Sequence, residues 1–330
     1  METQPFISVI VPVYNGERFL QRCLEPLTAS GKEVIVVDDC STDKSAEISR
    51  QLGATVLHMP RQSGPAGARN HGAQIALGEI LLFVDADVVL QSDSLERVAD
   101  DFVKNPDIAA VFGSYDDDPA EENFISQYKN LFHHFVHQQS RIDAQTFWAG
   151  CGAVRREVFL AVGGFNSERY PRPSIEDIEL GYRMRARGYR ILLDKQLQGK
   201  HLKKWDLKSL LHADIFCRAV PWSMLILESK GMVNDLNLQT SDRISAILAG
   251  LSVAIIPLSI LNPQLLIVVL ILLAIITLLN HKLYRFLIHR KGLGFAILSF
   301  PLHWLYYLYS GVTFVLCWFS HFFRQQLLKR

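Results

Sequence analysis

Two aspartates, Asp85 and Asp87, interrupt the apolar sequence FVDADVVL. Their spacing would place both side chains on one face of the preceding strand if that strand continued this far. Neighbouring carboxylates repel each other unless a positive charge neutralises them. Mg²⁺ or Mn²⁺ does this well, because the ion binds one or two protein carboxylates and completes its coordination with water and substrate phosphates. The pair therefore predicts a metal and diphosphate site, with an ordinary solvated turn as the alternative.

A second acidic pair, Asp38 and Asp39, ends the apolar run VVDD. Ligands of open parallel sheets bind beyond the carboxyl ends of the strands, so both acidic pairs are expected at one edge of the sheet. The glycine-rich sequence QSGPAGARNHGA places Arg69 near the expected start of a helix. A guanidinium group there could bind a phosphate. A surface arginine on a loop is the alternative.

A third acidic pair, Glu176 and Asp177, lies in PSIEDIELGYRMRARGYRI. Ser174 is expected to cap the start of a helix here, and Gly188 stands where that helix should stop. Carboxylates in a first helical turn compensate the helix dipole. Spacing alone favours this structural interpretation over a chemical one.

The elements that would position these residues form an alternating pattern from Phe6 to about Leu193. Short β-branched runs alternate with amphipathic segments, which is typical of βα units around a mostly parallel sheet. We predict strands at 7–14, 33–39, 54–60, 79–87 and 108–115, and helices at 17–30, 43–53, 65–78 and 92–105. No G-x-G-x-x-G motif follows the first strand, which argues against a dinucleotide-binding domain.

The composition changes after Arg243. The segments 244–261 and 264–279 contain no charged residue, and 293–319 contains none beyond one histidine. A helix needs roughly 20 apolar residues to cross a bilayer. We therefore predict a domain at 1–242 and a membrane domain at 243–330, with spans at about 244–261, 264–279 and 293–319. A buried helical hairpin is the alternative for the first two, and Pro301 leaves a re-entrant pair open for the third.

Basic residues gather between the second and third expected spans, at Lys282, Arg285, Arg290 and Lys291. Positive charge near the ends of spans marks the cytoplasmic side. The N-terminal sequence lacks the basic region and the cleavage site of a signal peptide. We therefore expect a multi-pass protein of the cell membrane whose first domain is cytoplasmic.

The composition also excludes some classes of protein. The net charge of +1 and the lack of a long basic block before the C-terminal third argue against a nucleic-acid partner. The five cysteines are scattered, so neither a disulfide framework nor a structural zinc site is expected. His133, His134 and His137 lie in LFHHFVHQQ, which we interpret as an interfacial or acceptor-side helix rather than a metal site.

Seven motifs occur in the order seen in the inverting GT-A glycosyltransferases of family 2, which residues 5–205 resemble. They are SVIVPVYNG, VVDDCSTD, GPAGARNHGA, FVDAD, FWAGCGAVRREVF, GGF and EDIELGYRMRARGYRI. The resemblance implies an α/β GT-A fold, Rossmann-like with a mostly parallel sheet and flanking helices. It also implies transfer of a sugar from a nucleotide-diphospho-sugar, with a UDP-sugar favoured.

The resemblance implies roles for individual residues. Base and ribose would contact the segment from Pro12 to Tyr14 and Asp39, while Asp38 would support that loop. Asp85 and Asp87 match the pair at metal and diphosphate, with Asp87 the more direct ligand. Asp177 matches the family's candidate general base, which would deprotonate an acceptor hydroxyl.

Other residues are implied at the pocket for the sugar and the acceptor. Trp148 would line this pocket together with Glu176 and Trp205; the alternative for Trp148 is an ordinary buried aromatic residue. His201 could be a further metal ligand. The sequence KHLKKW departs from the Q-x-x-R-W form of processive polysaccharide synthases, which favours transfer of a single sugar.

The acceptor is inferred from the expected spans, because an enzyme with soluble substrates has little use for a membrane anchor. A lipid or lipid-linked acceptor follows. Two alternatives remain open: a polyisoprenyl-phosphate glycosyltransferase, and a non-catalytic GT-A-like scaffold that assists saccharide assembly or transport.

Overall fold

The computed structural model describes residues 4–229 and 236–327 and divides the chain into two compact units. Unit 1 ends at Trp205 and unit 2 begins at Asp206. The division predicted from composition, after residue 242, lies inside unit 2. The reason is that α8 (Leu207–His212) and α9 (Val220–Ser229) pack, directly or through the π-helical turn η1 (Ala213–Ala219), with the long helix α13 (Leu293–Leu327) of the same unit.

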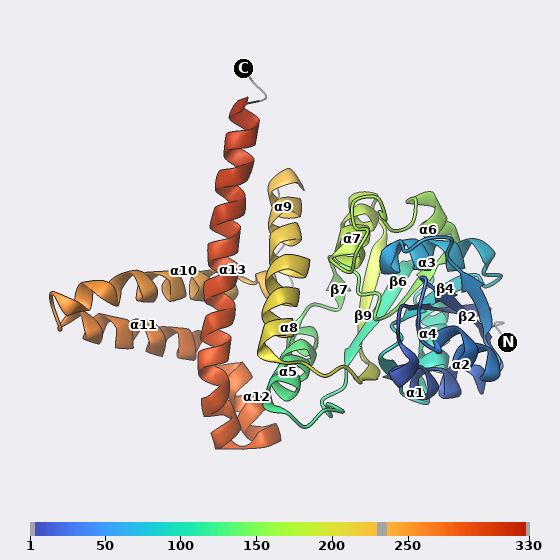
Figure 1. Ribbon diagram of the computed structural model, residues 1–330, viewed down its shortest axis with the longest axis horizontal. Coiled ribbons are helices and arrows are strands. Elements are labelled where there is room, and N and C mark those ends of the chain that lie inside the picture. The colour runs from blue at the N-terminus through green and yellow to red at the C-terminus, as the bar shows by residue number, and fades with distance from the viewer. Residues whose placement is uncertain (1–3, 230–235, 328–330) are drawn as a thin grey trace. The chain divides into compact units, whose positions relative to one another are not determined.

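Unit 1 is built on a sheet that has nine strands in the described part of the chain (Figure 1). The strands are β1 (Ile7–Val13), β2 (Glu33–Asp38), β3 (Thr55–His58), β4 (Ile80–Val84), β5 (Val88–Leu90), β6 (Ile108–Tyr115), β7 (Asp143–Ala144), β8 (Cys151–Arg155) and β9 (Arg190–His201). Their order is β3-β2-β1-β4-β8-β6-β9-β5, and β7 pairs with β9. The first four strands in this order are mutually parallel, whereas β8 runs antiparallel to both of its neighbours. The expected α/β class is confirmed, with a mixed second half of the sheet.

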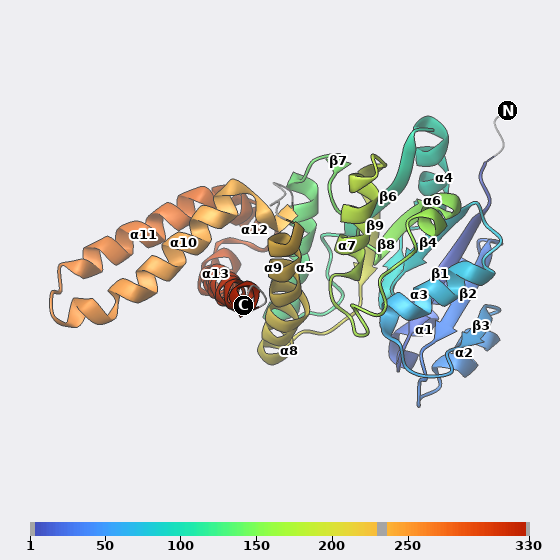
Figure 2. The same ribbon diagram turned by 90° about the horizontal axis from the view of Figure 1, so that it is seen from above.

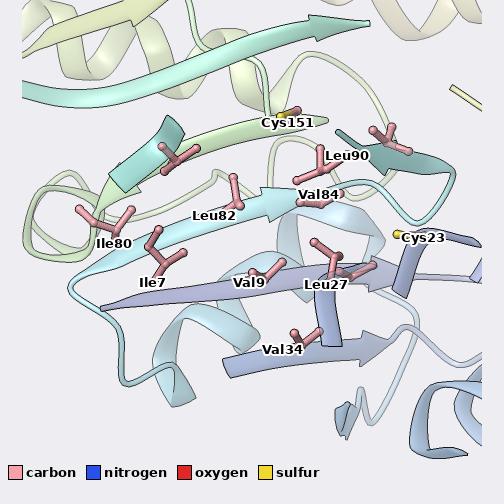
Figure 3. Packing of buried hydrophobic residues seen from close by; sticks show 14 of the residues in the cluster. Ile7, Val9, Cys23, Leu27, Val34, Ile80, Leu82, Val84, Leu90 and Cys151 are labelled. Atoms are coloured by element: carbon pink, nitrogen blue, oxygen red, sulfur yellow. The ribbon is translucent and has the colours of Figure 1, made fainter. Parts of the chain in front are cut away.

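Helices cover both faces of this sheet. The core on one face includes side chains of α1 (Glu17–Thr28) and α4 (Ser94–Lys104), with α2 (Ser45–Gln51) packed against it. The core on the other face includes α3 (Gly64–Ile75), α6 (Arg156–Ala161) and α7 (Glu176–Ala186). Along β1, Ile7 and Val9 face the first core (Figure 3). Ile10 faces the second core, as the period of two of a strand requires. Burial on both faces explains why these strands are nearly continuous apolar runs.

Two details differ from the sequence prediction at the edge where the acidic residues lie. The fourth expected strand, 79–87, ends early, because β4 stops at Val84 and residues 85–87 form a turn before β5. Helix α7 begins at Glu176 with Ile175, not Ser174, at the cap position and no side-chain cap. Instead, the Glu176 carboxylate accepts the backbone N–H of Ser174 at 2.9 Å.

The described part of unit 2 is helical. After α9 come the helices α10 (Thr240–Ile255), α11 (Leu265–Leu279) and α12 (His281–Lys291), before α13. Helices α10 and α11 form a hairpin, and α13 packs against α10 and runs across the hairpin's direction (Figure 2). The exposed residues at the hairpin tip include Leu258, Ile260 and Leu261.

Two helices of the described residues are long and apolar enough to cross a membrane, Leu207–Ser229 and Thr240–Ile260. The second agrees with the expected span at 244–261. The expected span at 264–279 is α11, which qualifies only together with α12, although the two are bent by 70°. The expected span at 293–319 lies in α13, which is outside this set because aromatic and polar residues interrupt its aliphatic sequence. Leu207–Ser229 was missed because it carries several charged residues.

Candidate functional site

Arg69 joins two of the acidic motifs. Its Nη2 lies 2.6 Å from Asp85 Oδ1, and its Nη1 lies 3.0 Å from Glu176 Oε1. The guanidinium is buried, and its Cζ lies 5.4 Å from the ring centroid of Phe165. The expectation that Arg69 is available to a phosphate differs from this arrangement, in which the cation neutralises two carboxylates. The packing of α3 against the sheet brings Arg69 to these partners, which its sequence neighbours do not reveal.

Asp87 faces a different partner from Asp85, because the turn after β4 separates the two side chains. Asp87 Oδ2 lies 3.5 Å from Nε2 of His201, at the end of β9. His201 Nδ1 donates to Asn130 Oδ1 at 2.8 Å, which directs Nε2 toward the carboxylate. Although burial opposes ionisation, the charges of His201 and Lys203 hold the pKa of Asp87 below its usual value. Asp87 is therefore a carboxylate at neutral pH.

The contact between Asp87 and His201 fits a bound cation. With Nδ1 donating to Asn130, Nε2 is the ring nitrogen of His201 that faces the Asp87 carboxylate. A cation between these two atoms would contact both of them. Carboxylate and imidazole are both ligands of Mn²⁺-type ions, and a diphosphate can supply the remaining ligands. Among the residues described, no group of three or more His, Cys, Asp or Glu side chains could hold a metal alone.

Asp38 and Asp39 organise the loops at the ends of β1 and β2. Asp39 Oδ1 accepts the backbone N–H of Ser63 and Oδ2 accepts that of Gly64, both at 2.8 Å. Asp38 Oδ1 accepts the Ser41 N–H at 3.1 Å, and Oδ2 lies 3.1 Å from His58 Nδ1. Both carboxylates are buried. A ribose hydroxyl could therefore bind Asp39 only through oxygen lone pairs that do not already accept these N–H groups.

Pro12 and Tyr14 stand on either side of the end of β1. Pro12 is buried inside the strand, whereas Tyr14 follows it with 51% of its surface exposed. The next residue, Asn15, has φ 51°, and its side-chain oxygen accepts the backbone N–H of Thr42. This turn leaves the Tyr14 ring open to a planar ligand beside the Asp39 loop.

Asp177 has an unusual environment at the start of α7. Its Oδ2 accepts the backbone N–H of Ala149 at 3.1 Å. Burial, and next the charge of Glu176, raise the pKa of Asp177 to about 7, against the opposing effects of the Ala149 N–H and Arg69. A carboxyl group with this pKa can accept a proton near neutral pH. Compensation of the helix dipole does not explain such a shift, since a helix start favours the ionised form.

An aromatic wall of Tyr115, His133, Trp148 and His201 connects these acidic residues. Tyr115 stacks on His201 with ring centroids 4.3 Å apart, and its centroid lies 4.9 Å from that of Trp148. His133 lies 4.9 Å from Trp148. Trp148 precedes Ala149, whose N–H binds Asp177, while His201 contacts Asp87. Trp148 is half-buried, so part of its ring can meet a ligand.

Trp205 and Glu176 are less accessible than the sequence suggested. Trp205 is 4% exposed, and the Lys203 ammonium lies 4.3 Å from its ring centroid. Glu176 is 5% exposed and bound to Arg69. The structure therefore buries both side chains, whereas Trp148 is only partly buried.

The remaining histidines of α5 (Phe124–Gln139) are structural. His134 Nδ1 donates to the Tyr115 carbonyl at 2.8 Å, and His137 Nδ1 donates to the Gly113 carbonyl at 2.9 Å. Burial lowers the pKa of His137 to about 4, so it is neutral. These bonds fasten α5 to β6, and His137 also packs against His133 and Trp148 of the aromatic wall, with ring centroids 4.1 Å and 5.5 Å away.

Sequence reasoning missed Tyr115, Asn130 and Lys203. Tyr115 is the last residue of the strand predicted at 108–115, so its place at the carboxyl edge was a usable signal. Asn130 has no local signal, because only the tertiary fold brings it to His201. Lys203 was visible only as one of several lysines in KHLKKW.

Comparison with known proteins agrees with this geometry. The model of the family "Glycosyl transferase family 2" matches residues 8–163. "Glycosyltransferase GlyG" of Streptococcus pneumoniae is 35% identical over 127 residues, which cover 36% of this chain and 42% of that protein. An uncharacterized glycosyltransferase of Haemophilus influenzae is 30% identical over 176 residues, covering 49% and 56%. The chain thus spans only about half the length of these curated relatives.

A solved structure extends the likeness of fold over most of the chain. The mannosyltransferase PcManGT from Pyrobaculum calidifontis, in complex with GDP-Man and Mn²⁺, has a TM-score of 0.58 and 19% sequence identity. The match covers 95% of this chain and 88% of that one. The expected GT-A-like fold is therefore confirmed, and residues 8–163 of the chain carry a glycosyl transferase family 2 domain.

Proposed function

We propose that this protein is an inverting glycosyltransferase that moves one sugar from a nucleotide-diphospho-sugar to a lipid or lipid-linked acceptor. The observation that carries the proposal is Asp177, a carboxyl group with a pKa of about 7 close to the half-buried Trp148. The named relatives are glycosyltransferases, which supports a catalytic chain over a non-catalytic scaffold.

In this mechanism Asp177 takes the proton of the acceptor hydroxyl as the acceptor oxygen attacks the anomeric carbon. The bond between that carbon and the diphosphate oxygen breaks, and its electron pair leaves with the nucleoside diphosphate. Trp148 positions the sugar by contact with its ring face, and the neighbouring Ala149 N–H orients the Asp177 carboxyl. A base placed opposite the leaving group inverts the anomeric configuration.

The donor side of the site is assigned to the loops around β1, β2 and β4. The exposed Tyr14 ring would stack on the base, with Asp39 contacting the ribose and Asp38 supporting the loop. Asp87 and His201 would hold Mg²⁺ or Mn²⁺. The ion would stabilise the negative charge that develops on the leaving diphosphate. Asp85, fixed by Arg69, would limit where the ion and the diphosphate can lie. We propose a UDP-sugar as the donor.

A membrane location supports the lipid acceptor. Two helices of unit 2 have the length and composition of spans, and the exposed side chains of the α10–α11 hairpin are largely apolar. Large exposed apolar surfaces of this kind mark membrane or protein contacts. We propose that unit 2 holds the chain at the cytoplasmic face of the cell membrane.

A donor screen with the purified full chain tests the proposed activity. Nucleotide release should depend on one nucleotide-sugar, on Mg²⁺ or Mn²⁺, and on an added membrane lipid extract. The product should be recovered in the organic phase. Equal transfer to a water-soluble acceptor without lipid would contradict the lipid acceptor, and no release with any donor would contradict catalysis.

One alternative rests on the chemistry of the acceptor. A polyisoprenyl phosphate is already ionised near neutral pH and needs no general base. If such a lipid is the acceptor, Asp177→Asn should retain most of the activity. The raised pKa of Asp177 favours a hydroxyl acceptor.

A further inference from the structure

Helix α12 has a basic surface that the proposed function does not use. Its side chains Leu283, Tyr284 and Leu287 are buried, and the helix packs against α13. Tyr284 contacts Phe300 and His303 of that helix, with ring centroids 6.2 Å and 6.1 Å apart. The buried residues follow a helical spacing, so they define one face of α12.

The opposite face of α12 is positively charged and exposed. Lys282, Arg285 and His289 share this face at intervals of three and four residues. Arg290 and Lys291 follow in the last turn, and both are exposed. We call these five residues the basic face.

Three side chains of the basic face have no acidic partner nearby. Lys282, Arg285 and Lys291 have no carboxylate partner within the described ranges 4–229 and 236–327. The sequence contains no Asp or Glu after Asp242. A group that neutralises these three side chains therefore comes from outside the described part of the chain.

The geometry next to α12 indicates what that partner is. The apolar helix α11 carries no charge, and the chain bends by 70° between α11 and α12 (Figure 1). If α11 enters the hydrocarbon core, α12 lies close to the membrane plane. Ile288, between the buried and basic faces, is 43% exposed, and Leu293 directly after the helix is 62% exposed. Apolar residues beside lysines and arginines are typical of interfacial helices, whose basic side chains reach headgroups.

We propose that the basic face of α12 docks on the headgroups of anionic phospholipids. This proposal rests on the membrane location given under the proposed function. Anionic headgroups supply the negative charge that the sequence after Asp242 lacks, and lipid chains accept Ile288 and Leu293. Basic residues next to a membrane segment bind such lipids through this attraction.

The test uses the full chain purified in an uncharged detergent. Its melting temperature is measured as phosphatidylglycerol, phosphatidylcholine or inorganic phosphate is titrated, because a ligand that binds the folded state raises this temperature. Phosphatidylglycerol should stabilise the protein at much lower concentration than phosphatidylcholine, and inorganic phosphate should not. Equal effects of the two lipids, or an equal effect of phosphate, would overturn the proposal.

Charge variants identify the surface. Combined Lys282→Gln, Arg285→Gln, Arg290→Gln and Lys291→Gln should remove the preference for phosphatidylglycerol, since each basic residue contributes roughly five-fold in affinity. The matched control replaces Arg22, Lys44, Lys104 and Arg141 of unit 1 by Gln, which removes the same charge and should keep the preference. If the combined variant does not fold, the single variants Lys282→Gln and Arg285→Gln should each weaken the lipid effect. An unchanged preference in the folded variants would refute the role of α12.

Two further readouts separate this proposal from the proposed function. Nucleotide binding by the same samples reports on unit 1 and should be unaffected by the α12 substitutions. A chain recovered in the aqueous fraction without detergent would contradict the membrane location itself. A membrane-bound chain without lipid preference would contradict only the docking of α12.

Discussion

The pH dependence of turnover should report directly on Asp177. With a pKa of about 7, this carboxyl is half ionised at pH 7 and about one-tenth ionised at pH 6. If the ionised form is the base, kcat/KM with a hydroxyl acceptor, which reports the pKa values of the free enzyme, should rise roughly tenfold from pH 6 to pH 8. An aspartate with the ordinary value of 3.8 would be fully ionised over this range and kcat/KM would not change. A flat profile would refute the reasoning.

Glu176→Gln should move the rising part of this pH profile, its acidic limb, to lower pH. The substitution removes a negative charge that raises the pKa of Asp177, while the larger effect of burial remains. The limb should therefore shift without reaching the ordinary value of an aspartate. Glu179→Gln, on the same helix but paired with Arg183, is the matched control and should leave the limb in place. A limb that shifts equally in both variants would indicate a general disturbance of α7.

Asp177→Asn should lower kcat by roughly 10²–10⁴ with nucleotide binding nearly unchanged. The asparagine has one oxygen where the carboxylate uses two, for the N–H groups of Ala149 and Ile178, so one hydrogen bond worth about 1 kcal/mol is lost. The assay is nucleotide release, with melting temperature as the control for folding. Full activity of this variant would remove Asp177 as the base.

The same pKa also predicts how stability depends on pH. Because the folded state holds the Asp177 proton more tightly than the unfolded state, ionisation opposes folding. The free energy of unfolding should therefore decrease as the pH rises from about 4, where the unfolded chain loses this proton, to about 7, where the folded protein loses it. Urea titrations of wild type and Asp177→Asn should show a difference that changes over this range; a constant difference would contradict the raised pKa.

Three further predictions concern the other parts of the site. Asp87→Asn should abolish turnover in a folded protein, and excess chelator should do the same to wild type, so full activity in chelator would exclude the metal. Arg69→Met should lower the free energy of unfolding by about 3 kcal/mol, because it leaves the buried Glu176 carboxylate unpaired; a loss near zero in a urea titration would contradict this. Gly64→Ala should destabilise by more than about 1 kcal/mol, since its φ is +73° and an added Cβ would lie 2.6 Å from the Pro171 carbonyl oxygen. Gly53→Ala, with φ +85° and open space, is the control for the backbone strain alone.

Much of unit 1 could be predicted from local sequence. The strands at 7–14, 33–39 and 108–115 and the helices between them depend on hydrophobic period and turn residues, which are properties of neighbouring positions. The ordered motifs predicted the family and the GT-A fold for the same reason, and the comparisons confirm both. Antiparallel β8, by contrast, was not expected, because strand direction depends on pairing between distant segments.

The same distinction between local sequence and tertiary contacts applies to the chemistry of the site. Residue type and position at a strand end, which are local facts, made Asp38, Asp39 and Asp87 candidates, whereas Asp177 became one only through the resemblance to the family. Only the tertiary structure decided the partners: Arg69 with Asp85 and Glu176, and His201 with Asp87. A pKa depends on burial and on charges that arrive from other elements, so the shift of Asp177 to about 7 could not be predicted from its neighbours in the chain.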